Sequence, residues 1–455
     1  MEPKRRFTLV PDAFDQVNYL HNEGLFVLED SLIRYCSSGF SRFHVPGHKG
    51  SFSLDFSYDV TELDCTDDLY NSNGRIKRSE CIISELYGSS FSLFSTQGNT
   101  LCIQTMISLV ASSGDKIIVA RNCHESVVNS MALLGVVPIW VDYDENGNVS
   151  HLSIAEKLNE NPDVCGIFIT SPDYFGSIAN IKAIKSISRN IPVLVDNSHG
   201  SHLIFFEMHP ISLGADLCAD SAHKTLPVLT GGAWLHIGNE FSRKFDIDYQ
   251  YAKQKMKMFA STSPSFLSLV SLEQCAKWMK NDGKKQFLSL RNKVEEFRHN
   301  AKKIVFKPHI DDPVRLTFDT SSIGYSSEEF IKHLELFEIK PEFGIENKTV
   351  LIPSPFNSDE DWIKLENAIR NIKPKRATFR DSYKNSVRKS VVLIREAMLS
   401  KSEKVPLNDC EGRVSAQIVS NYPPGIPIIL PGDIIDSEVL KLLRNMKIEY
   451  LRVMK

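Results

Sequence analysis

The segment DSAHKTLPVLTGG, residues 220–232, contains a lysine in a setting that suggests chemistry. Lys224 stands between a histidine and a threonine, just after an apolar run and just before a glycine pair. A lysine amine has a reference pKa of about 10.4, and it becomes a nucleophile where desolvation or nearby cations depress that pKa. His223 and closely packed strand ends would provide such a setting. The segment therefore predicts a reactive amine.

A carboxylate precedes this lysine in VLVDNSHGSHLIF, residues 193–205. Asp196 ends an apolar run there, and a buried carboxylate is costly unless it meets a cation or several donors. Two partners are open. Asp196 could join His199 and His202 in a D-x-x-H-x-x-H set of metal ligands, or it could pair with a protonated ring nitrogen of a bound cofactor.

Two further stretches offer contacts to a ligand. In STQGNT, residues 95–100, Gly98, Asn99 and Thr100 would place N–H groups and a hydroxyl at a helix N-terminus, where the helix dipole favours an anion. In RNCHES, residues 121–126, His124 could stack on a planar ligand. Residues of these types also cap helices without any ligand.

The order of these residues along the chain favours one chemistry. An anion-binding turn, a stacking ring, a strand-end carboxylate and a strand-end amine are the four requirements of pyridoxal phosphate. A metal-dependent hydrolase has no use for the lysine and leaves the turn unexplained. The residues therefore predict a pyridoxal phosphate site and no metal site.

The elements that must position these residues alternate between strands and helices from about residue 90 to 240. The predicted strands are apolar runs at 116–120, 136–143, 165–170, 191–196, 216–220 and 233–237. Several are apolar throughout, as in strands covered on both faces. This alternation predicts an α/β fold with a mainly parallel sheet, whose functional groups gather at the carboxyl ends of the strands.

Three parts are predicted along the chain. Residues 1–40 read as a helical arm, and residues 41–300 as the major domain. A long helix-forming stretch covers about 265–305, after which strand and helix patterns restart. Residues 301–455 therefore read as a smaller C-terminal α+β domain.

Composition narrows the class of protein. A net charge of −3 over 455 residues gives no general case for nucleic-acid or membrane binding. The nine cysteines include no C-x-x-C pair, which favours reduced thiols over disulfides or a zinc site. The N-terminus lacks the apolar core of a signal peptide, and no run approaches the roughly 20 apolar residues of a membrane span. We therefore expect a cytoplasmic protein acting on a small molecule.

Taken together, the motifs resemble those of the fold-type I, pyridoxal-phosphate-dependent Orn/Lys/Arg decarboxylases, especially the shorter bacterial branch. Besides the stretches above, the matches include RFHVPGHKG (42–50), SPDYFG (171–176), STSPSF (261–266) and EGRVSAQIVSNYPPGIPIILPGD (411–433). The resemblance implies a major domain of the aspartate-aminotransferase type. It also implies a decarboxylase that converts arginine, lysine or ornithine to a polyamine precursor and CO2, as a homodimer with shared active sites.

The resemblance also implies roles for single residues. Lys224 would bind the cofactor covalently, Asp196 would pair with its ring nitrogen, and His124 would stack on the ring. His199 would lie close to the cofactor. The phosphate would be held by backbone amides of the turn and by Gly98, Asn99, Thr100, Ser221 and His223, with Ser263 reaching it from a neighbouring subunit.

Departures from the family pattern keep other functions open. Asn197 and Ser198 interrupt the family's D-E-A-H-G-A-H run, and Gln417 stands where several short relatives carry a carboxylate. An aminotransferase or lyase acting on another amino acid is one alternative, and a non-catalytic relative is another. Retention of Asp196 with Lys224 argues against the latter, because a buried carboxylate without its cation is destabilising.

An acidic stretch, DVTELDCTDDLY at 59–70, has two interpretations. Its carboxylates could recognise a cationic substrate tail, or they could form a solvated loop. The residues concerned are Glu62, Asp64, Asp67 and Asp68.

Overall fold

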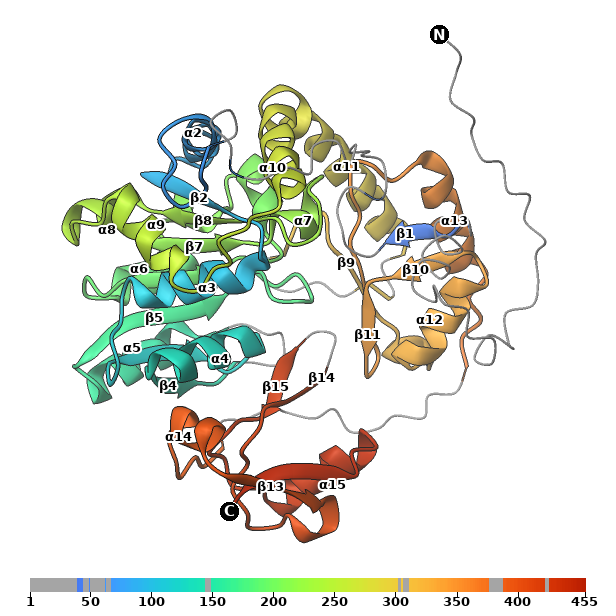
Figure 1. Ribbon diagram of the computed structural model, residues 1–455. Coiled ribbons are helices and arrows are strands. Elements are labelled where there is room, and N and C mark those ends of the chain that lie inside the picture. The colour runs from blue at the N-terminus through green and yellow to red at the C-terminus, as the bar shows by residue number, and fades with distance from the viewer. Residues whose placement is uncertain are drawn as a thin grey trace, which may run out of the picture.

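The largest sheet of the computed structural model has seven strands in the order β2-β8-β7-β6-β5-β3-β4 (Figure 1). The model describes residues 39–43, 49, 62, 67–143, 149–301, 304–305, 311–375, 388–421 and 425–455. All neighbouring strands of this sheet run parallel, except that β8 is antiparallel to β2 and β7. The strands are β2 Phe91–Ser95, β3 Lys116–Ala120, β4 Val137–Val141, β5 Val164–Thr170, β6 Val193–Asp196, β7 Leu217–Asp220 and β8 Ala233–Ile237.

This sheet confirms the predicted α/β class and the mainly parallel arrangement. Each of the six predicted strands overlaps one of the observed strands. Strand β2 was not predicted, because its sequence FSLFS mixes serines with apolar residues. Those serines are buried and satisfied by hydrogen bonds, as where Ser92 Oγ lies 2.8 Å from His236 Nδ1.

Helices cover both faces of the sheet, which explains why its strands are apolar throughout. Ile117 and Val119 of β3 join one hydrophobic cluster, whereas Ile118 and Ala120 join a second cluster on the other face. This is the two-residue alternation of a strand buried on both sides. The covering helices include α3 Gly98–Ser108, α4 Glu125–Leu134, α5 His151–Glu160 and α6 Ile181–Ile187.

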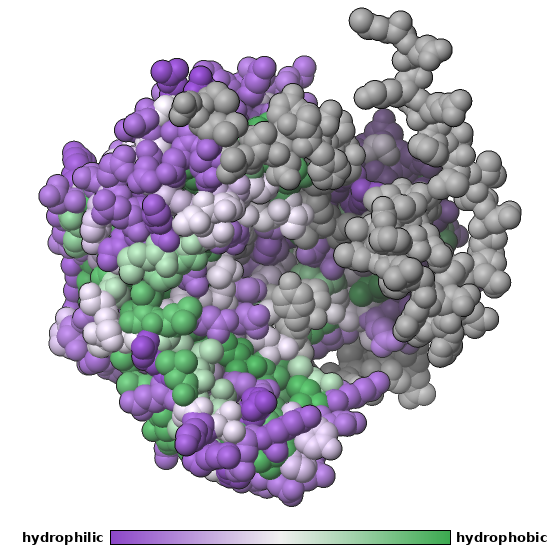
Figure 2. All heavy atoms as spheres, in the orientation of Figure 1, coloured by the Kyte–Doolittle hydropathy of each residue, from purple (hydrophilic) through white to green (hydrophobic). Residues whose placement is uncertain are grey.

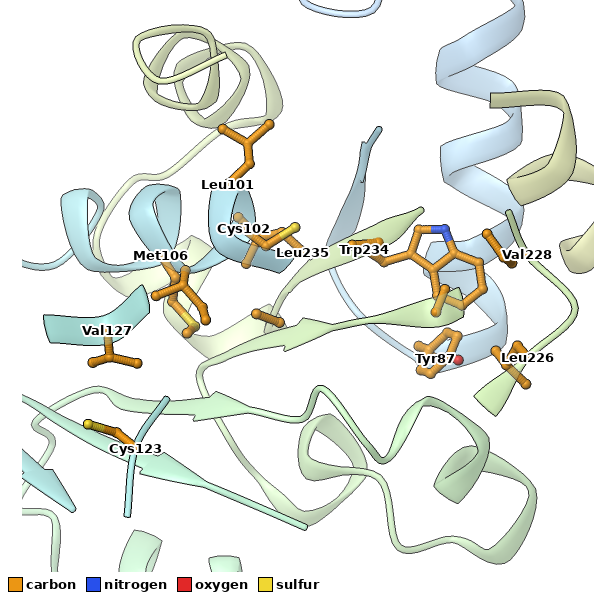
Figure 3. Packing of buried hydrophobic residues seen from close by; sticks show 14 of the residues in the cluster. Tyr87, Leu101, Cys102, Met106, Cys123, Val127, Leu226, Val228, Trp234 and Leu235 are labelled. Atoms are coloured by element: carbon orange, nitrogen blue, oxygen red, sulfur yellow. The ribbon is translucent and has the colours of Figure 1, made fainter. Parts of the chain in front are cut away.

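Helix α3 packs against the strand that follows the lysine segment. Figure 3 shows Cys102 and Met106 of α3 directed toward the strand that carries Trp234 and Leu235. All four side chains are at most 1% exposed. This packing holds the start of α3 beside the carboxyl ends of β6 and β7. The remaining helices of this part are α2 Arg75–Tyr87, α7 Ala222–Thr225, α8 Asn239–Lys244, α9 Tyr249–Lys257, α10 Phe266–Trp278 and α11 Lys284–Asn300.

A small second unit consists of elements that follow α11 along the chain, together with the early strand β1. Strands β9, β12 and β11 form an antiparallel sheet, and β1 pairs in parallel with β10. Two helices, α12 and α13, complete this unit. Its elements are β1 Ser41–Phe43, β9 Leu316–Asp319, α12 Ser327–Glu335, β10 Ile339–Pro341, β11 Phe343–Ile345, β12 Lys348–Leu351 and α13 Asp359–Arg370.

The last part of the chain has a hydrophobic core of its own, which includes Ile429, Val439 and Leu451. In Figure 1 these red elements lie together next to α4. They are α14 Ile394–Leu399, β13 Ser402–Pro406, β14 Val419–Asn421, β15 Ile426–Ile429, α15 Ser437–Asn445 and β16 Tyr450–Met454.

The structure describes only part of the predicted domain arrangement. The arm at 1–40 lies outside the described residues, apart from Gly39 and Phe40. The boundaries at 40 and 300 stay predictions. Among the described residues, the strands of 311–375 and those of 388–455 share no sheet. Within the described ranges, no helix combines the length and the apolar character needed to cross a bilayer.

Candidate active site

The predicted site residues meet at the carboxyl-terminal edge of the large sheet. Asp196 is the last residue of β6, and Ser221 and Lys224 follow the end of β7. Helix α3 begins at Gly98, and His124 is the N-cap of α4 after β3. Parallel strands bring their carboxyl ends to one edge, so residues far apart in the sequence become neighbours.

Asp196 is held in one orientation by donors from two residues. Its Oδ1 accepts hydrogen bonds from Asn99 Nδ2 at 3.0 Å, from the Ser198 amide at 3.1 Å and from Ser198 Oγ at 2.6 Å. The residue is 1% exposed. Among the described residues, every donor to this carboxylate reaches Oδ1. Oδ2 is therefore available to another donor.

Lys224 is partly buried, and its amine contacts a histidine. Its Nζ lies 3.1 Å from Nε2 of His199 and 5.8 Å from the centroid of the Tyr174 ring. Burial lowers the pKa of Lys224, although the negative charges of Asp196 and Glu342 oppose that shift. Burial and then the charge of Lys224 lower the pKa of His199 well below its usual value. Both shifts run toward the neutral form of the base.

His124 is the helix cap that one interpretation of its position allowed, and its stacking on a planar ligand stays a prediction. Its Nδ1 accepts a hydrogen bond from the Ser126 amide at 3.1 Å, so the ring caps α4. Burial lowers the pKa of His124, while Asp196 raises it and Lys224 lowers it further. The imidazole is thus close enough to both residues to share their electrostatic environment.

The predicted anion-binding turn is shaped by two glycines. Gly98 has φ +75° and donates its N–H to Gly231 O at 2.7 Å. Gly231 has φ +92°, and a Cβ there would lie 3.4 Å from Thr96 O. Both conformations favour glycine. The lysine segment thereby folds back against the start of α3.

Several predicted phosphate ligands have protein partners in this turn. The side chain of Asn99 faces Asp196, so its backbone N–H is the group left for an anion. Ser221 Oγ donates to Ser198 Oγ at 3.3 Å, and His223 Nδ1 donates to Gly232 O at 3.1 Å. Thr100 is exposed in the first turn of α3. The phosphate roles of Gly98, Asn99, Thr100, Ser221 and His223 stay predictions.

Ser263 lies in a stretch that approaches the same turn within one chain. The Gln97 side chain donates to Ser261 O at 3.5 Å, and Gln97 is the N-cap of α3. Ser263 itself is exposed. Its contact with the phosphate of a second subunit stays a prediction.

The metal-ligand alternative is not supported, because its three residues do not converge. His199 faces Lys224, whereas His202 Nε2 lies 2.9 Å from Asp312 Oδ1. Within the described ranges, one group alone has the proximity that a metal requires, namely His209, Cys218 and Asp220. That group is accounted for by hydrogen bonds, since the Asp220 carboxylate accepts from Asn197 Nδ2 at 2.7 Å and from His209 Nε2 at 3.2 Å.

The departures from the family pattern lie in different places. Ser198 donates to Asp196 and so belongs to the site, whereas Asn197 turns inward to Asp220. Gln417 lies in the C-terminal part, where its Oε1 accepts from the Arg452 amide at 3.1 Å. Of these three side chains, that of Ser198 contacts predicted cofactor residues in the described part of the chain, and those of Asn197 and Gln417 have the other partners named above.

The acidic stretch is used locally where the structure describes it. Asp67 Oδ2 accepts from the amides of Gly74 and Ile76 at the start of α2, at 3.1 and 3.0 Å. Asp68 Oδ1 accepts from the Tyr70 amide at 2.8 Å. These two carboxylates therefore stabilise a turn. Glu62 has no role assigned by these contacts, and Asp64 lies outside the described residues.

Sequence reasoning missed two residues of the small unit that reach the site. Arg315 donates from Nη2 to His199 O at 3.1 Å, and its Nη1 lies 3.3 Å from His199 Nδ1. Asp312 contacts both Arg315 and His202. Their sequence DDPVRLTF shows no motif, and only the predicted strand after Arg315 could have drawn attention to it.

Pyridoxal phosphate fits this arrangement at three points. Asp196 offers the uncommitted Oδ2 to a ring N–H, and the amine of Lys224 lies just after the end of the next strand. Beside the start of α3, the buried atoms Thr96 Oγ1 and Asn99 Oδ1 have no hydrogen-bond partner among the described residues. Buried polar atoms of this kind normally have partners. The Thr96 hydroxyl can donate to a phosphate, whereas the amide oxygen of Asn99 can only accept a hydrogen bond.

Comparisons with known proteins identify the family of the chain. Residues 27–371 match the family model of the Orn/Lys/Arg decarboxylase major domain, and residues 375–454 match that of the C-terminal domain. The arginine decarboxylase of Bacillus subtilis is 30% identical over 438 residues, which cover 87% of this chain and 88% of that protein.

Solved structures show the same fold. The lysine decarboxylase A of Pseudomonas aeruginosa superimposes with a TM-score of 0.75 at 16% identity, covering 96% of this chain and 84% of that one. The lysine decarboxylase of Francisella novicida gives a TM-score of 0.72 at 19% identity, and the match covers 85% of this chain and 73% of that one.

Proposed function

This chain belongs to the Orn/Lys/Arg decarboxylase family, and we propose that it removes the α-carboxyl group of a basic amino acid with bound pyridoxal phosphate. One observation carries the proposal. The carboxylate of Asp196 ends β6, and Lys224 lies in the short helix α7 that directly follows the neighbouring strand β7, at the edge where α3 begins. That arrangement supplies both a partner for a ring nitrogen and a covalent anchor.

Each residue has a defined task in this proposal. Pyridoxal phosphate, when bound, supplies the sink for the electrons of the broken Cα–carboxyl bond. Oδ2 of Asp196 would hold the proton on the ring nitrogen, and Lys224 would hold the cofactor through its amine. His124 would cover one face of the ring, and the N–H groups at the start of α3 would hold the phosphate.

The same residues would control the proton. A neutral Lys224 amine can accept the proton that the substrate ammonium gives up, whereas an ammonium has no lone pair to do so, and burial shifts Lys224 toward the neutral form. After CO2 leaves, Nζ of Lys224 would return a proton to Cα of the substrate. His199, within hydrogen-bond distance of Nζ, would orient the amine for that transfer.

Arginine is the first substrate to test. It is favoured because the Bacillus subtilis relative, which is named an arginine decarboxylase, matches this chain over most of its length. Lysine and ornithine follow as the other substrates in the family name. Each product would be an amine that serves as a polyamine precursor.

Released CO2 tests the reaction directly. Purified protein with pyridoxal phosphate is incubated separately with arginine, lysine and ornithine, and CO2 is measured beside keto-acid formation from added pyruvate. We expect CO2 with at least one of the three. Keto acid without CO2 would favour the aminotransferase alternative, and no turnover with any of them would favour the non-catalytic one.

Variants at Lys224 test the anchor. Lys224→Ala should lower turnover by at least roughly 100-fold and should abolish covalent retention of cofactor after borohydride reduction. Lys224→Arg is the matched control, because it keeps a cation at this position but provides no amine for the covalent bond. Retention of cofactor on Lys224→Ala after reduction would contradict the assignment.

We also propose a homodimer in the cytoplasm, with Ser263 of one copy facing the phosphate of the other. The exposure of Ser263 supports this, as do the apolar residues that Figure 2 shows over the region of α3, α4 and β15. Among large apolar side chains, Leu133 of α4 is 60% exposed. All seven cysteines in the described ranges are free thiols, which suits a reducing compartment. Sedimentation would give the oligomeric state, and a monomer would contradict a shared site.

A further inference from the structure

Arg315 of the small unit and Lys224 at the edge of the large sheet both contact the same histidine, His199. The Nη1 atom of Arg315 lies 3.3 Å from His199 Nδ1, and His199 Nε2 lies 3.1 Å from Lys224 Nζ. Arg315 and His199 are buried, at 2% and 3% exposed, and Lys224 is partly buried. The two ring nitrogens therefore each face one nitrogen-bearing side chain.

The proton positions in this row follow from the chemistry of the three groups. Arginine stays protonated in proteins and can only donate. Nδ1 of His199 must therefore be unprotonated to accept from Nη1. A neutral imidazole carries one N–H, which then lies on Nε2 and points at Lys224 Nζ. An amine nitrogen can accept that hydrogen bond only in its neutral form, because an ammonium has no lone pair.

We infer that Arg315 is a positioning residue that fixes the Nε2–H tautomer of His199, so that His199 donates a hydrogen bond to the neutral amine of Lys224. The inference rests on the proposed function only where Lys224 is taken as the cofactor anchor. It assigns to Arg315 a role that acts through His199 rather than by contact with the reacting atoms.

Two further contacts hold the guanidinium of Arg315 in place. Nη2 donates to the carbonyl oxygen of His199 at 3.1 Å and lies 3.5 Å from Asp312 Oδ2. Asp312 is also fixed by His202 Nε2. The pair of histidines in the DNSHGSH run is therefore held by the pair Asp312 and Arg315, which joins the large sheet to the small unit.

The charges around Lys224 act together with this row. Asp196 on β6 and Glu342 beside β11 favour the ammonium, whereas Arg315 opposes it. His124 at α4 also senses Lys224, and His223 and His124 act with Arg315 on His199. Only the His199 ring contacts the amine by a hydrogen bond among the described residues. The tautomer of that ring is therefore the most direct control over the Lys224 proton.

Nitrogen NMR of the full chain, freed of cofactor, tests the tautomer. With 15N-labelled histidine, the His199 signals are identified by their loss in His199→Asn. We expect Nδ1 to resonate as a pyridine-type nitrogen and Nε2 as a pyrrole-type nitrogen. A wild-type ring with the proton on Nδ1, or on both nitrogens at neutral pH, would overturn the inference by itself.

Variants at Arg315 test its part. Arg315→Met removes the donor and should give a mixture of tautomers, whereas Arg315→Lys keeps a charged donor and should retain the Nε2–H form. Arg121→Met is the matched control, because Arg121 is equally buried but contacts the carbonyls of Pro427 and Ile428. An unchanged His199 spectrum in a folded Arg315→Met protein would overturn the inference.

The lysine provides a second readout without turnover. The rate at which an amine reagent labels Lys224, followed by peptide mass spectrometry across pH, reports its proton equilibrium. The labelling curve should move to higher pH by about one unit in Arg315→Met, which is the size of one lost hydrogen bond, and by less in Arg315→Lys. These measurements need neither cofactor nor substrate, so they succeed or fail separately from the CO2 test of the proposed function.

Discussion

At the scale of single residues, the site depends on which groups hold each functional side chain. Asp196 has three donors on Oδ1, and two of them, the amide and Oγ of Ser198, come from a position where the family usually has another residue. A hydrogen bond in a buried site contributes about 0.5–1.5 kcal/mol. Residues that orient Asp196 should therefore affect cofactor binding in small, measurable steps.

Ser198→Ala should weaken the affinity for pyridoxal phosphate by roughly 3- to 10-fold, because Asp196 loses one donor. Absorbance titration of the cofactor-free chain measures this affinity. Asp196→Ala provides the upper limit and should weaken binding much more. If the two variants lost equal affinity for the cofactor, Ser198 would not act merely by orienting Asp196.

Asp173 should make the stability of the protein depend on pH. Burial raises the pKa of its carboxyl to about 6, although the amides of Ser177 and Phe175 oppose the shift. Because the folded state holds this proton more tightly than the unfolded chain, stability falls as pH rises from about 4 to about 6. The total loss is roughly 3 kcal/mol.

Asp173→Asn removes this dependence while keeping an oxygen for both amides. Its thermal midpoint should exceed that of the wild type at pH 8 and match it at pH 4. Calorimetry at both values measures the difference, and a variant that gains equally at pH 4 and pH 8 would contradict a titrating Asp173.

At the scale of elements, tight turns decide how closely the small unit approaches the sheet edge. Gly176, in the SPDYFG turn after β5, has φ +94°, and a Cβ there would lie 2.9 Å from Cγ of Arg315. The turn is thus left open for the arginine that positions His199. A larger residue would have to move either the turn or Arg315.

Gly176→Ala should lower turnover by roughly 100-fold, because a shift of about 1 Å in a positioning group has effects of that size. Gly88→Ala is the matched control, since Gly88 also has positive φ, +68°, but nothing lies within 4 Å of its added Cβ. Both variants should lose stability from backbone strain. Similar turnover in the two variants would show that contact with Arg315 is unimportant.

At the scale of the whole molecule, hydrogen bonds join the C-terminal part to the start of α4, beside the candidate site. The Glu125 amide donates to Gly425 O at 3.0 Å, and Ser420 Oγ donates to Glu125 Oε2 at 3.1 Å. Glu125 directly follows His124. Arg121, at the end of β3, extends the contact by donating to Pro427 O at 2.9 Å. The position of β15 is therefore coupled to the start of α4.

Arg121→Met should loosen this attachment, because it leaves buried carbonyl groups without a donor at a cost of about 1–3 kcal/mol. Hydrogen–deuterium exchange should rise in β14 and β15 and stay unchanged in β7. Arg413→Met is the control, since Arg413 pairs with Glu403 within the C-terminal part. Unchanged exchange in β14 and β15 would mean that other contacts carry the attachment.

Much of the fold could be read from local patterns. Apolar runs predicted β3 to β8, and polar residues at their ends predicted where Asp196 and Lys224 would lie. The motifs identified the family, which the comparisons confirm. Strand β2 was not predicted because its buried serines give its sequence a polar character. The hydrogen-bond partner of Ser92 comes from a distant element, β8.

The sequence by itself determined which residues stand at strand ends, because alternation and apolar runs depend on neighbours along the chain. Only the tertiary structure decided which way their side chains are held. Asn99 faces Asp196 instead of standing free for a phosphate, and His199 meets an arginine 116 residues further along the chain. Such contacts follow from how helices and the small unit pack on the sheet edge, which no local pattern encodes.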